Sequence, residues 1–330
     1  MPGVIRAAIT GFGSAVPERV MTNHDLEKIL DTSDEWITKR TGIKERRIVS
    51  DGETTSMLSA QAARGALASA GIRAEELDLI VCGTVSPDMP FPASACLVQD
   101  AIGAKHIPAF DLSAACSGFV YSLTVGSQFV ETGKYKKVLV IGADCLSRVA
   151  DFADRGSCIL FGDGAGAVVL EATSEPDKGV VHTVMGADGS GWDFIHVPGG
   201  GTKHPTTHET VDEKLHYVKM RGRDVYKFAV DKMQWLLGDC MEKCSLGVDD
   251  VDMVIPHQVN IRIIESATSK YNFPMDKVYV NIDRYGNTSA ASIPLAMDEA
   301  IKKGAIGPGS TVIIVAFGAG LTWAGATIKL

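Results

Sequence analysis

The sequence predicts an α/β protein built from two similar halves. Apolar runs typical of buried strands alternate with stretches of helical periodicity, as expected for sheets covered by helices on both faces. The run around Asp78 matches the run around Asp252, an offset of 174 residues (252 − 78). The next pair of runs aligns Val138 with Val312 at the same offset (312 − 138), so we interpret the two halves as a duplication.

The expected strands are short apolar runs without polar alternation. They cover 7–13, 77–85, 137–144 and 165–172, and then 180–188, 251–259, 310–320 and 323–330. Two segments between them, 54–70 and 224–244, carry apolar side chains at helical spacing. Thr54 and Thr55 are both suitable N-caps for the first of these helices.

The boundary between the halves is expected where the composition changes. Residues 173–180 contain the proline, glycine and charges typical of a linker. We therefore expect an amino-terminal half at 1–174 and a carboxy-terminal half at 175–330. Each half closes with a glycine-rich turn into a strand, at 161–170 and 317–328.

Composition and charge exclude several classes of protein. The 330 residues can bury a sizeable core, and the net charge of −8 argues against a general nucleic-acid binder, which needs Lys and Arg to neutralise phosphates. No apolar stretch reaches the roughly 18–20 residues of a membrane span, and Gly11 and Gly13 interrupt the amino-terminal run. The seven cysteines are scattered and odd in number, which indicates free thiols in a reducing, cytoplasmic compartment.

Cys116, in the segment DLSAACSGFVYSL, is the main candidate for catalysis. Small residues flank it, and Ser113 is placed to cap a helix that begins at about Cys116. A thiol at the amino terminus of a helix has a lowered pKa, which makes the nucleophilic thiolate accessible. The other six cysteines are expected to be small buried hydrophobes.

The duplication brings two further polar residues toward Cys116. Its counterpart at the offset of 174 is Ala290, so a pseudo-two-fold axis places the neighbouring Asn287 close to the thiol. His257 ends an expected strand, and ligands of α/β sheets bind outside the carboxyl ends of strands. Alone, His257 is typical of a hydrogen-bonded core residue and Asn287 of a turn. Together with Cys116 they form a candidate catalytic triad.

Three other patterns do not predict a site. The segment TGFGSAV at 10–16 lacks the third glycine of a dinucleotide fingerprint, and no acidic residue follows at the expected distance. Cys240 and Cys244 have no second pair of ligands, so no metal is expected there. Tight packing of strands explains the glycines of 162–167 as well as a phosphate loop would.

Four segments in combination indicate a family. DLSAACSGFVYSL, VIPHQVNIRI, DRYGNTSAASIP and DEWITKRTGIKERR resemble β-ketoacyl-[acyl-carrier-protein] synthase III, the initiating condensing enzyme of type II fatty-acid synthesis. The resemblance covers nearly the whole chain. It implies the thiolase fold, an α/β fold whose duplicated halves form a five-layered αβαβα core, usually in a homodimer.

The resemblance implies an acyltransferase that condenses two substrates. The Cys116 thiolate would take an acyl group, acetyl in the first place, from acyl-CoA. Malonyl-acyl-carrier-protein would then lose carbon dioxide, and its carbanion would attack the acyl-enzyme to give 3-ketoacyl-acyl-carrier-protein. His257, neutral, and Asn287 would donate hydrogen bonds to the malonyl thioester carbonyl, and the backbone N–H groups of Cys116 and Ala319 would form a second oxyanion hole.

The resemblance also assigns the contacts to both substrates. Trp36 and Arg155 match the pair that encloses the CoA adenine, as an aromatic face and a guanidinium plane can. The remaining CoA contacts would be Arg40, Gly222 and Arg223, of which Arg223 replaces a smaller polar residue of some relatives. Phe91 matches a residue that reaches across the dimer to floor the acyl pocket. CoA is a substrate here, so no cofactor and no metal are implied.

Charge predicts where the carrier protein docks. The carrier is strongly acidic and the chain carries a net charge of −8, so docking requires a local basic patch. We expect this patch at Arg221, Lys227 and Arg262, with help from the basic segment 39–47.

Other enzymes on the same fold are the alternatives. Thiolases use a second cysteine near the carboxyl terminus, whereas the last cysteine here is Cys244. Elongating synthases pair two histidines, whereas Asn287 stands at the second position, and plant-type polyketide synthases are longer. A starter-unit condensing enzyme or an acyltransferase of secondary, polyketide-like metabolism stays open. A non-enzymatic subunit is disfavoured by the intact triad. The primer stays open too, because a pocket separates acyl groups that differ by a few methylenes by only about 1–3 kcal/mol.

Overall fold

Two mixed β-sheets organise the chain in the computed structural model, which describes residues 5–175 and 177–330. Residues 1–4 of the expected amino-terminal half, and Pro176 of the expected linker, lie outside the described residues. The first sheet has the order β1-β7-β6-β4-β5 and the second the order β11-β12-β13-β8.

All eight expected strands are present, some with shorter bounds. The first sheet contains β1 (Arg6–Ala15), β4 (Leu79–Gly83), β5 (Ala109–Leu112), β6 (Lys137–Cys145) and β7 (Asp163–Thr173). The second sheet contains β8 (Gly179–Ala187), β11 (Met253–Pro256), β12 (Thr311–Gly318) and β13 (Thr322–Lys329). The sequence analysis missed β5 and two small ribbons. These ribbons pair β2 (Val20–Thr22) with β3 (Glu45–Arg47), and β9 (Ile195–His196) with β10 (Lys219–Met220).

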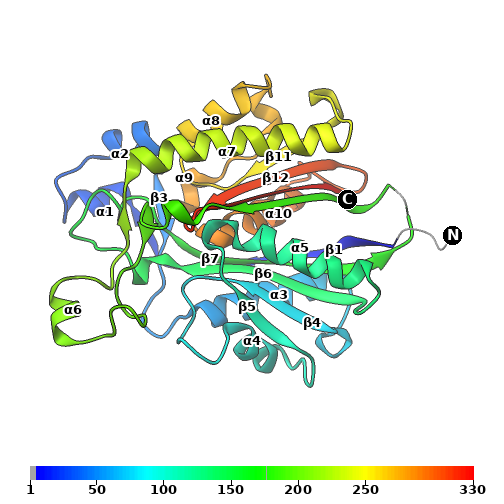
Figure 1. The fold of residues 1–330 in the computed structure, drawn as a ribbon, viewed down its shortest axis with the longest axis horizontal. Helices are drawn as coiled ribbons and strands as arrows, with labels where there is room; N and C mark the ends of the chain where they lie inside the picture. Colours follow the sequence, from blue (N-terminus) through cyan, green and yellow to red (C-terminus); the bar gives the residue numbers. More distant parts are fainter. Residues whose placement is uncertain (1–4, 176) are drawn as a thin grey trace.

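Helices lie between and outside the two sheets, so that the fold has five layers (Figure 1). One outer layer contains α3 (Thr55–Ala70) and α4 (Ser94–Ile102), and the other contains α7 (Gly222–Lys243) and α8 (Ile261–Ser269). The middle layer contains α5 (Gly118–Glu131) and α10 (Ser292–Lys302). This arrangement confirms the expected αβαβα core. The shorter helices are α1 (Asn23–Glu27), α2 (Asp34–Thr41), α6 (His208–Asp212) and α9 (Ile282–Tyr285).

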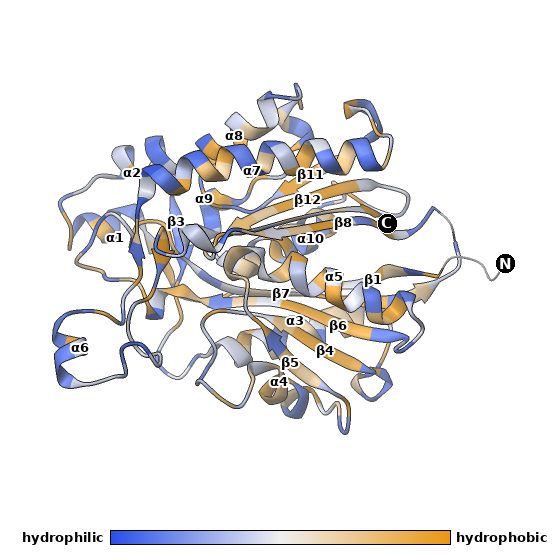
Figure 2. Ribbon diagram, viewed as in Figure 1, coloured by the Kyte–Doolittle hydropathy of each residue, from blue (hydrophilic) through white to orange (hydrophobic). Residues whose placement is uncertain are grey.

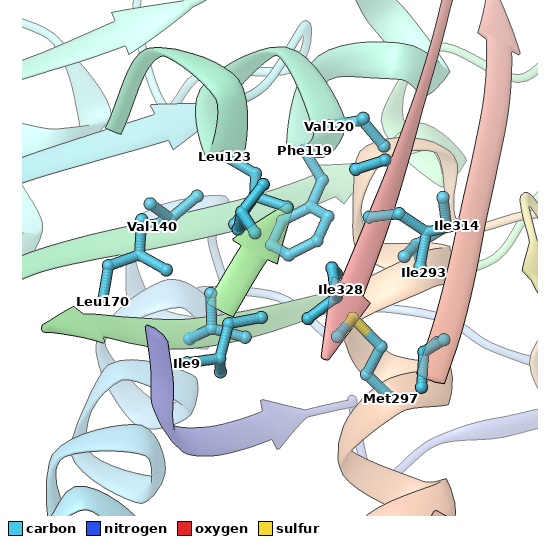
Figure 3. Packing of buried hydrophobic residues seen from close by; sticks show 14 of the residues in the cluster. Ile9, Phe119, Val120, Leu123, Val140, Leu170, Ile293, Met297, Ile314 and Ile328 are labelled. Carbon is cyan, nitrogen blue, oxygen red and sulfur yellow. The ribbon is translucent and has the colours of Figure 1, made fainter. Parts of the chain in front are cut away.

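The middle layer forms the core between the sheets. Phe119 and Leu123 of α5 are 0% exposed and belong to the same apolar cluster as Ile293 and Met297 of α10 (Figure 3). The central strands are apolar along most of their length, whereas α7 alternates polar and apolar residues (Figure 2). This difference is expected, because the strands are covered on both faces and α7 on one. Thr54 caps α3 with its hydroxyl, which accepts the N–H of Met57.

The duplication is visible in hydrogen bonds as well as in strand order. In the parallel pair β4–β6 the Asp78 carboxylate accepts the N–H of Lys137 at 3.0 Å. In the parallel pair β11–β12 the Asp252 carboxylate accepts the N–H of Thr311 at 2.7 Å. Asp78 and Asp252 are related by the offset of 174, and so are Lys137 and Thr311.

Two equivalent turns meet at the centre of the molecule. The 3₁₀ turn η2 (Ala115–Ser117) precedes α5, and its counterpart η7 (Ser289–Ala291) precedes α10 at the same offset of 174. The approach is close, because a Cβ added to Gly142 of β6 would lie 2.3 Å from the Ala290 carbonyl oxygen. The fold therefore brings the Cys116 turn and the Asn287 segment together.

Candidate active site

The η2 turn carries Cys116 to the wall of a cavity of about 270 Å³. Ala115, just before it, adopts a left-handed φ of 47°, and its counterpart Ser289 in η7 has a φ of 53°. Such values are uncommon for residues other than glycine and cluster at functional sites. Cys116 is a free thiol and stays partly exposed toward the cavity.

The expected helix cap at Cys116 is wrong. The helix α5 begins at Gly118, its N-cap is Ser117, and Ser117 makes no side-chain capping hydrogen bond. Cys116 therefore lies in the 3₁₀ turn before the helix, and Ser113 does not cap it. The chain must turn sharply here to pass between the halves, and this requirement outweighs a local capping preference.

Burial raises the pKa of the Cys116 thiol to about 12, the opposite of the shift expected from sequence. Desolvation is the main cause; the Ser289 side chain opposes the rise and the buried Asp144 carboxylate adds to it. Cys116 is therefore a thiol at neutral pH, so a nucleophilic role would require it to lose its proton during the reaction.

Apolar side chains form most of the cavity wall. They include Val85, Leu146, Phe161, Ile195, Val218 and Phe317. Polar groups gather around the thiol, where Asn287 and Ser289 line the same cavity. A cavity with apolar walls and a few convergent polar groups is suited to a small, largely apolar ligand.

His257 presents an unpartnered ring nitrogen inside the protein. The residue follows β11 and is 0% exposed, and its ring packs edge-on against Phe317 at 5.6 Å between centroids. Nδ1 lies 2.7 Å from the Ser292 hydroxyl, whereas Nε2 has no hydrogen-bond partner among the described residues. Burial lowers the pKa of His257 to about 3, so the ring is neutral near pH 7.

The Asn287 side chain is oriented by its own turn. Its Oδ1 accepts the N–H of Ser289 at 2.9 Å, and its backbone pairs with Leu160 and Gly162. The amide oxygen is thus occupied while the amide N–H₂ group remains for a ligand, since Asn287 lines the cavity. The orientation makes Asn287 a donor.

Cys116 is the second residue of η2, and Ala290 is the second residue of η7. The backbone N–H groups of these two residues differ in their hydrogen bonding, and the duplication explains the difference. In η7 the N–H of Ala290 donates to the Asp144 carboxylate at 3.2 Å. The counterpart of Asp144 is Gly318 (318 − 144 = 174), where an added Cβ would lie 2.8 Å from the Cys116 nitrogen. In the described chain, the N–H groups of Cys116 and Ala319 donate to no other residue. Two such donors can stabilise an oxyanion.

A second cleft, of about 490 Å³, adjoins the cavity and shares Leu160, Met220 and Val225 with it. It collects all five residues expected to contact CoA: Trp36, Arg40, Arg155, Gly222 and Arg223. The Arg40 and Arg155 guanidinium groups lie 4.7 Å and 5.2 Å from the centre of the Trp36 ring. The cleft therefore offers an aromatic face and several cations beside the cavity that holds Cys116.

The basic residues expected to dock the carrier differ in their surroundings. Arg221 already pairs with Asp193 at 3.1 Å and Asp224 at 2.8 Å. Arg262 lines the mouth of the cleft, and both Arg262 and Lys227 are exposed. Neither forms an ion pair within the described part of the chain. These two cations are the ones available to a partner.

Phe91 does not line the cavity of its own chain. It lies on the loop between β4 and α4 and is 83% exposed. Within residues 5–175 and 177–330, no group of three or more His, Cys, Asp or Glu side chains could hold a metal. No helix in these ranges is long and apolar enough to cross a membrane.

Sequence reasoning missed Ser292, Asp144 and Gly318, which surround the triad. None stands out as a motif, because serine at a helix start, aspartate at a strand end and glycine before a turn are all ordinary. The repeat offset of 174 could have found them, since it relates Ser292 to Gly118 and Asp144 to Gly318.

Comparisons with known proteins agree with this geometry. Residues 110–189 match the family described as 3-Oxoacyl-[acyl-carrier-protein (ACP)] synthase III, and residues 241–330 match its C-terminal family. The chain is 51% identical over 325 residues to Beta-ketoacyl-[acyl-carrier-protein] synthase III of Caldanaerobacter subterraneus, and 51% over 324 residues to that of Clostridioides difficile, with 98% of each chain covered.

Solved structures show the same similarity. The 3-oxoacyl-[acyl-carrier-protein] synthase III of Aquifex aeolicus matches with a TM-score of 0.91 and 47% identity, covering 98% of this chain and 100% of that one. The priming β-ketosynthase of the R1128 polyketide biosynthetic pathway matches with a TM-score of 0.91 and 33% identity, covering 100% of this chain and 98% of that one.

Proposed function

Because the chain belongs to the β-ketoacyl-[acyl-carrier-protein] synthase III family, we propose that its cavity condenses a short acyl-CoA with malonyl-acyl-carrier-protein. The family membership makes the chain a condensing acyltransferase of fatty-acid biosynthesis. The observations that support this site most strongly are that Cys116 and Asn287 line one cavity, and that His257, whose Nε2 has no partner among the described residues, packs against the cavity residue Phe317. No cofactor is required, because CoA enters as part of a substrate.

The first half-reaction transfers the acyl group to Cys116. Sγ forms a bond to the acyl carbon, the thioester bond to CoA breaks, and the thiol proton leaves with the CoA sulfur. The tetrahedral oxyanion would accept hydrogen bonds from the N–H groups of Cys116 and Ala319, which donate to no other residue in the described chain. Gly318 keeps this space open, since any Cβ there would crowd the Cys116 nitrogen.

The second half-reaction forms the new carbon–carbon bond. The malonyl carboxylate leaves as CO₂, and the resulting enolate oxygen would be stabilised by Nε2–H of His257 and by the Asn287 amide. The enolate carbon attacks the acyl carbon, and the Cys116 sulfur leaves and takes up one proton. A neutral His257 suits this role. Burial lowers its pKa to about 3, so the ring can donate a hydrogen bond without carrying a positive charge that would attract the malonyl carboxylate.

The adjoining cleft is proposed as the CoA site. The Trp36 ring and the Arg155 guanidinium would enclose the adenine, and Arg40, Gly222 and Arg223 would contact the rest. The cleft shares Leu160, Met220, Val225 and Val259 with the cavity, so a thioester bound there would lie beside the cavity that holds Cys116.

Arg262 and Lys227 are proposed to dock the acidic carrier protein, with Arg221 and the basic segment 39–47 beside them. Both cations are exposed, and Arg262 lines the cleft while Lys227 follows the cleft residue Tyr226 in α7. Arg262→Glu should lower turnover with malonyl-acyl-carrier-protein while Cys116 is still acylated by acyl-CoA. Lys270→Glu, the same charge change at the other end of α8, is the control. Equal loss of both half-reactions in Arg262→Glu refutes the assignment.

The enzyme is further proposed to act in the cytoplasm and to form a homodimer. The two halves of each chain are proposed to be residues 1–174 and 175–330. Three exposed apolar side chains of one loop support the dimer, namely Val85 (40%), Met89 (41%) and Phe91 (83%). In the dimer, Phe91 would close the partner's acyl pocket. Sedimentation of wild type and Phe91→Asp tests this, because a monomeric wild type contradicts it.

A panel of acyl-CoAs with malonyl-acyl-carrier-protein tests the function. Condensation should occur with short acyl-CoAs in wild type and in Cys244→Ala, whose sulfur lies outside the cavity, and should be lost in Cys116→Ala. Full condensation by Cys116→Ala refutes the mechanism. Failure of every short acyl-CoA to acylate wild type would favour the alternative of a starter-unit enzyme of polyketide-like metabolism, a possibility supported by the structural similarity to the priming β-ketosynthase.

A further inference from the structure

Among the described residues, the His257 ring has one side-chain hydrogen-bond partner. Its Nδ1 lies 2.7 Å from Oγ of Ser292, the first residue of α10, which is 2% exposed. The same Oγ is 3.4 Å from the N–H of Gln258, which donates to it. Neither Ser292 nor His257 is among the residues that line the cavity, and the side-chain contact of Ser292 is with the His257 ring.

These contacts fix the direction of the hydrogen bond. The Gln258 N–H uses a lone pair of Oγ, so the Ser292 hydroxyl hydrogen needs an acceptor of its own. Among the described residues, the acceptor within hydrogen-bond distance of the Ser292 hydroxyl is Nδ1 of His257. Buried hydroxyl groups are rarely left without a partner. Nδ1 is therefore unprotonated, and a neutral imidazole must then carry its proton on Nε2.

The duplication relates these two residues to a pair of glycines in the other half. The counterparts of His257 and Ser292 in the other half are Gly83 (257 − 83 = 174) and Gly118 (292 − 118 = 174). These glycines face each other directly, since a Cβ added to Gly118 would lie 3.5 Å from the Gly83 Cα. The amino-terminal half thus has two glycines in contact at the position where the carboxy-terminal half has a histidine and the serine that is its hydrogen-bond partner.

We propose that Ser292 is a positioning residue that holds His257 in the Nε2–H tautomer and so prepares it to donate to the malonyl thioester carbonyl. This inference rests on the proposed condensation, because that carbonyl is the acceptor it requires. Ser292 touches no substrate. Its contribution belongs to the decarboxylating half-reaction, in which Nε2 must donate.

The tautomer can be observed directly. In ¹⁵N-histidine-labelled enzyme, the His257 resonances are assigned by their loss in His257→Gln. Wild type should show a protonated Nε2 and an unprotonated Nδ1 near pH 7, and Ser292→Ala should show a mixture of tautomers or the reverse one. Protonated Nδ1 in wild type overturns the proposal. This measurement on wild type can overturn the proposal even if a variant fails to fold.

Kinetics supply the second test. Ser292→Ala should slow the release of CO₂ from malonyl-acyl-carrier-protein by about three- to tenfold, the range that one neutral hydrogen bond represents. Acylation of Cys116 by acyl-CoA should change less than twofold. Ser292→Thr, which keeps the hydroxyl, should recover the loss. Ser127→Ala is the matched control, because Ser127 is a 1% exposed serine of α5 whose hydroxyl donates to a helix carbonyl.

The outcomes separate this inference from the proposed function. Wild-type decarboxylation and an unchanged Nε2–H tautomer in Ser292→Ala overturn the positioning role. An equal loss of both half-reactions in Ser292→Ala also overturns it, because this indicates a general structural defect. Failure of the proposed function would instead appear in wild type as absence of acylation by every short acyl-CoA, whatever the tautomer of His257.

Discussion

The substitution Gly318→Ala tests the geometry of the nucleophile turn with the smallest possible change. A Cβ at this position would lie 2.8 Å from the Cys116 nitrogen and 2.9 Å from the Ala114 carbonyl oxygen. Ordinary contact begins at 3.4 Å, so the turn and the strand must separate by roughly 0.6 Å (3.4 − 2.8). Both atoms are backbone, and β12 pairs with β11 on one side and β13 on the other. We therefore expect the Cys116 turn to move.

The expected size of the effect follows from this displacement. Overpacking of this kind costs about 1–3 kcal/mol of the free energy of unfolding, measured by urea denaturation. A misplacement of about 1 Å at a reacting group can cost about 100-fold in rate, so Gly318→Ala should lose about 10- to 100-fold in condensation. The loss should already appear in the rate of Cys116 acylation, since the crowded nitrogen is the proposed oxyanion donor.

Gly307→Ala is the control for Gly318→Ala. No atom lies within 4 Å of a Cβ added to Gly307, and its φ is not left-handed. Its free energy of unfolding should change by less than about 0.5 kcal/mol and its activity should be unchanged. Wild-type acylation and condensation by Gly318→Ala would refute the reasoning that this glycine keeps the oxyanion site open.

Three further predictions follow from buried ionisable groups. Because burial raises the pKa of Cys116 to about 12, its alkylation by iodoacetamide should accelerate about tenfold per pH unit between about pH 6 and 9, and a plateau in this range contradicts the shift. Asp144→Asn places an amide where the carboxylate accepts N–H groups from Ala290 and Ser86, so it should lower the free energy of unfolding by about 1–3 kcal/mol; urea stability equal to wild type contradicts this. The pKa of His257 falls from 6.5 unfolded to about 3 folded, so the unfolded state binds this proton first as the pH falls. Wild type should therefore lose stability by up to about 1.4 kcal/mol per pH unit below about pH 6 relative to His257→Phe, and equal slopes in the two proteins contradict this.

Sequence patterns predicted the elements whose signal is local. The eight strands are continuous apolar runs and the helices at 54–70 and 224–244 are strongly periodic, so burial on one or both faces could be inferred. The strand β5 (Ala109–Leu112) escaped because it is only half-buried and contains a charge. The ribbon β9–β10 escaped because its strands are two residues long and are separated by a polar loop.

The proximity of Cys116 and Asn287, which line one cavity, could be predicted because the repeat offset supplied a long-range contact. It placed Asn287 beside Cys116 before any side-chain geometry was known. The direction of the pKa shift of Cys116 could not be predicted, because it depends on burial in the folded protein, which raises the pKa, and Cys116 lies in the turn before the helix. Asp144, which contributes to that shift, is distant in sequence and looks like an ordinary residue at a strand end.

The covalent intermediate on Cys116 is the central claim, and intact-protein mass spectrometry with peptide mapping tests it most directly. After incubation with a short acyl-CoA, the acyl group should be found on Cys116, and addition of malonyl-acyl-carrier-protein should remove it as 3-ketoacyl-acyl-carrier-protein appears. An acyl group found on another residue, or one that malonyl-acyl-carrier-protein does not remove, would contradict the account.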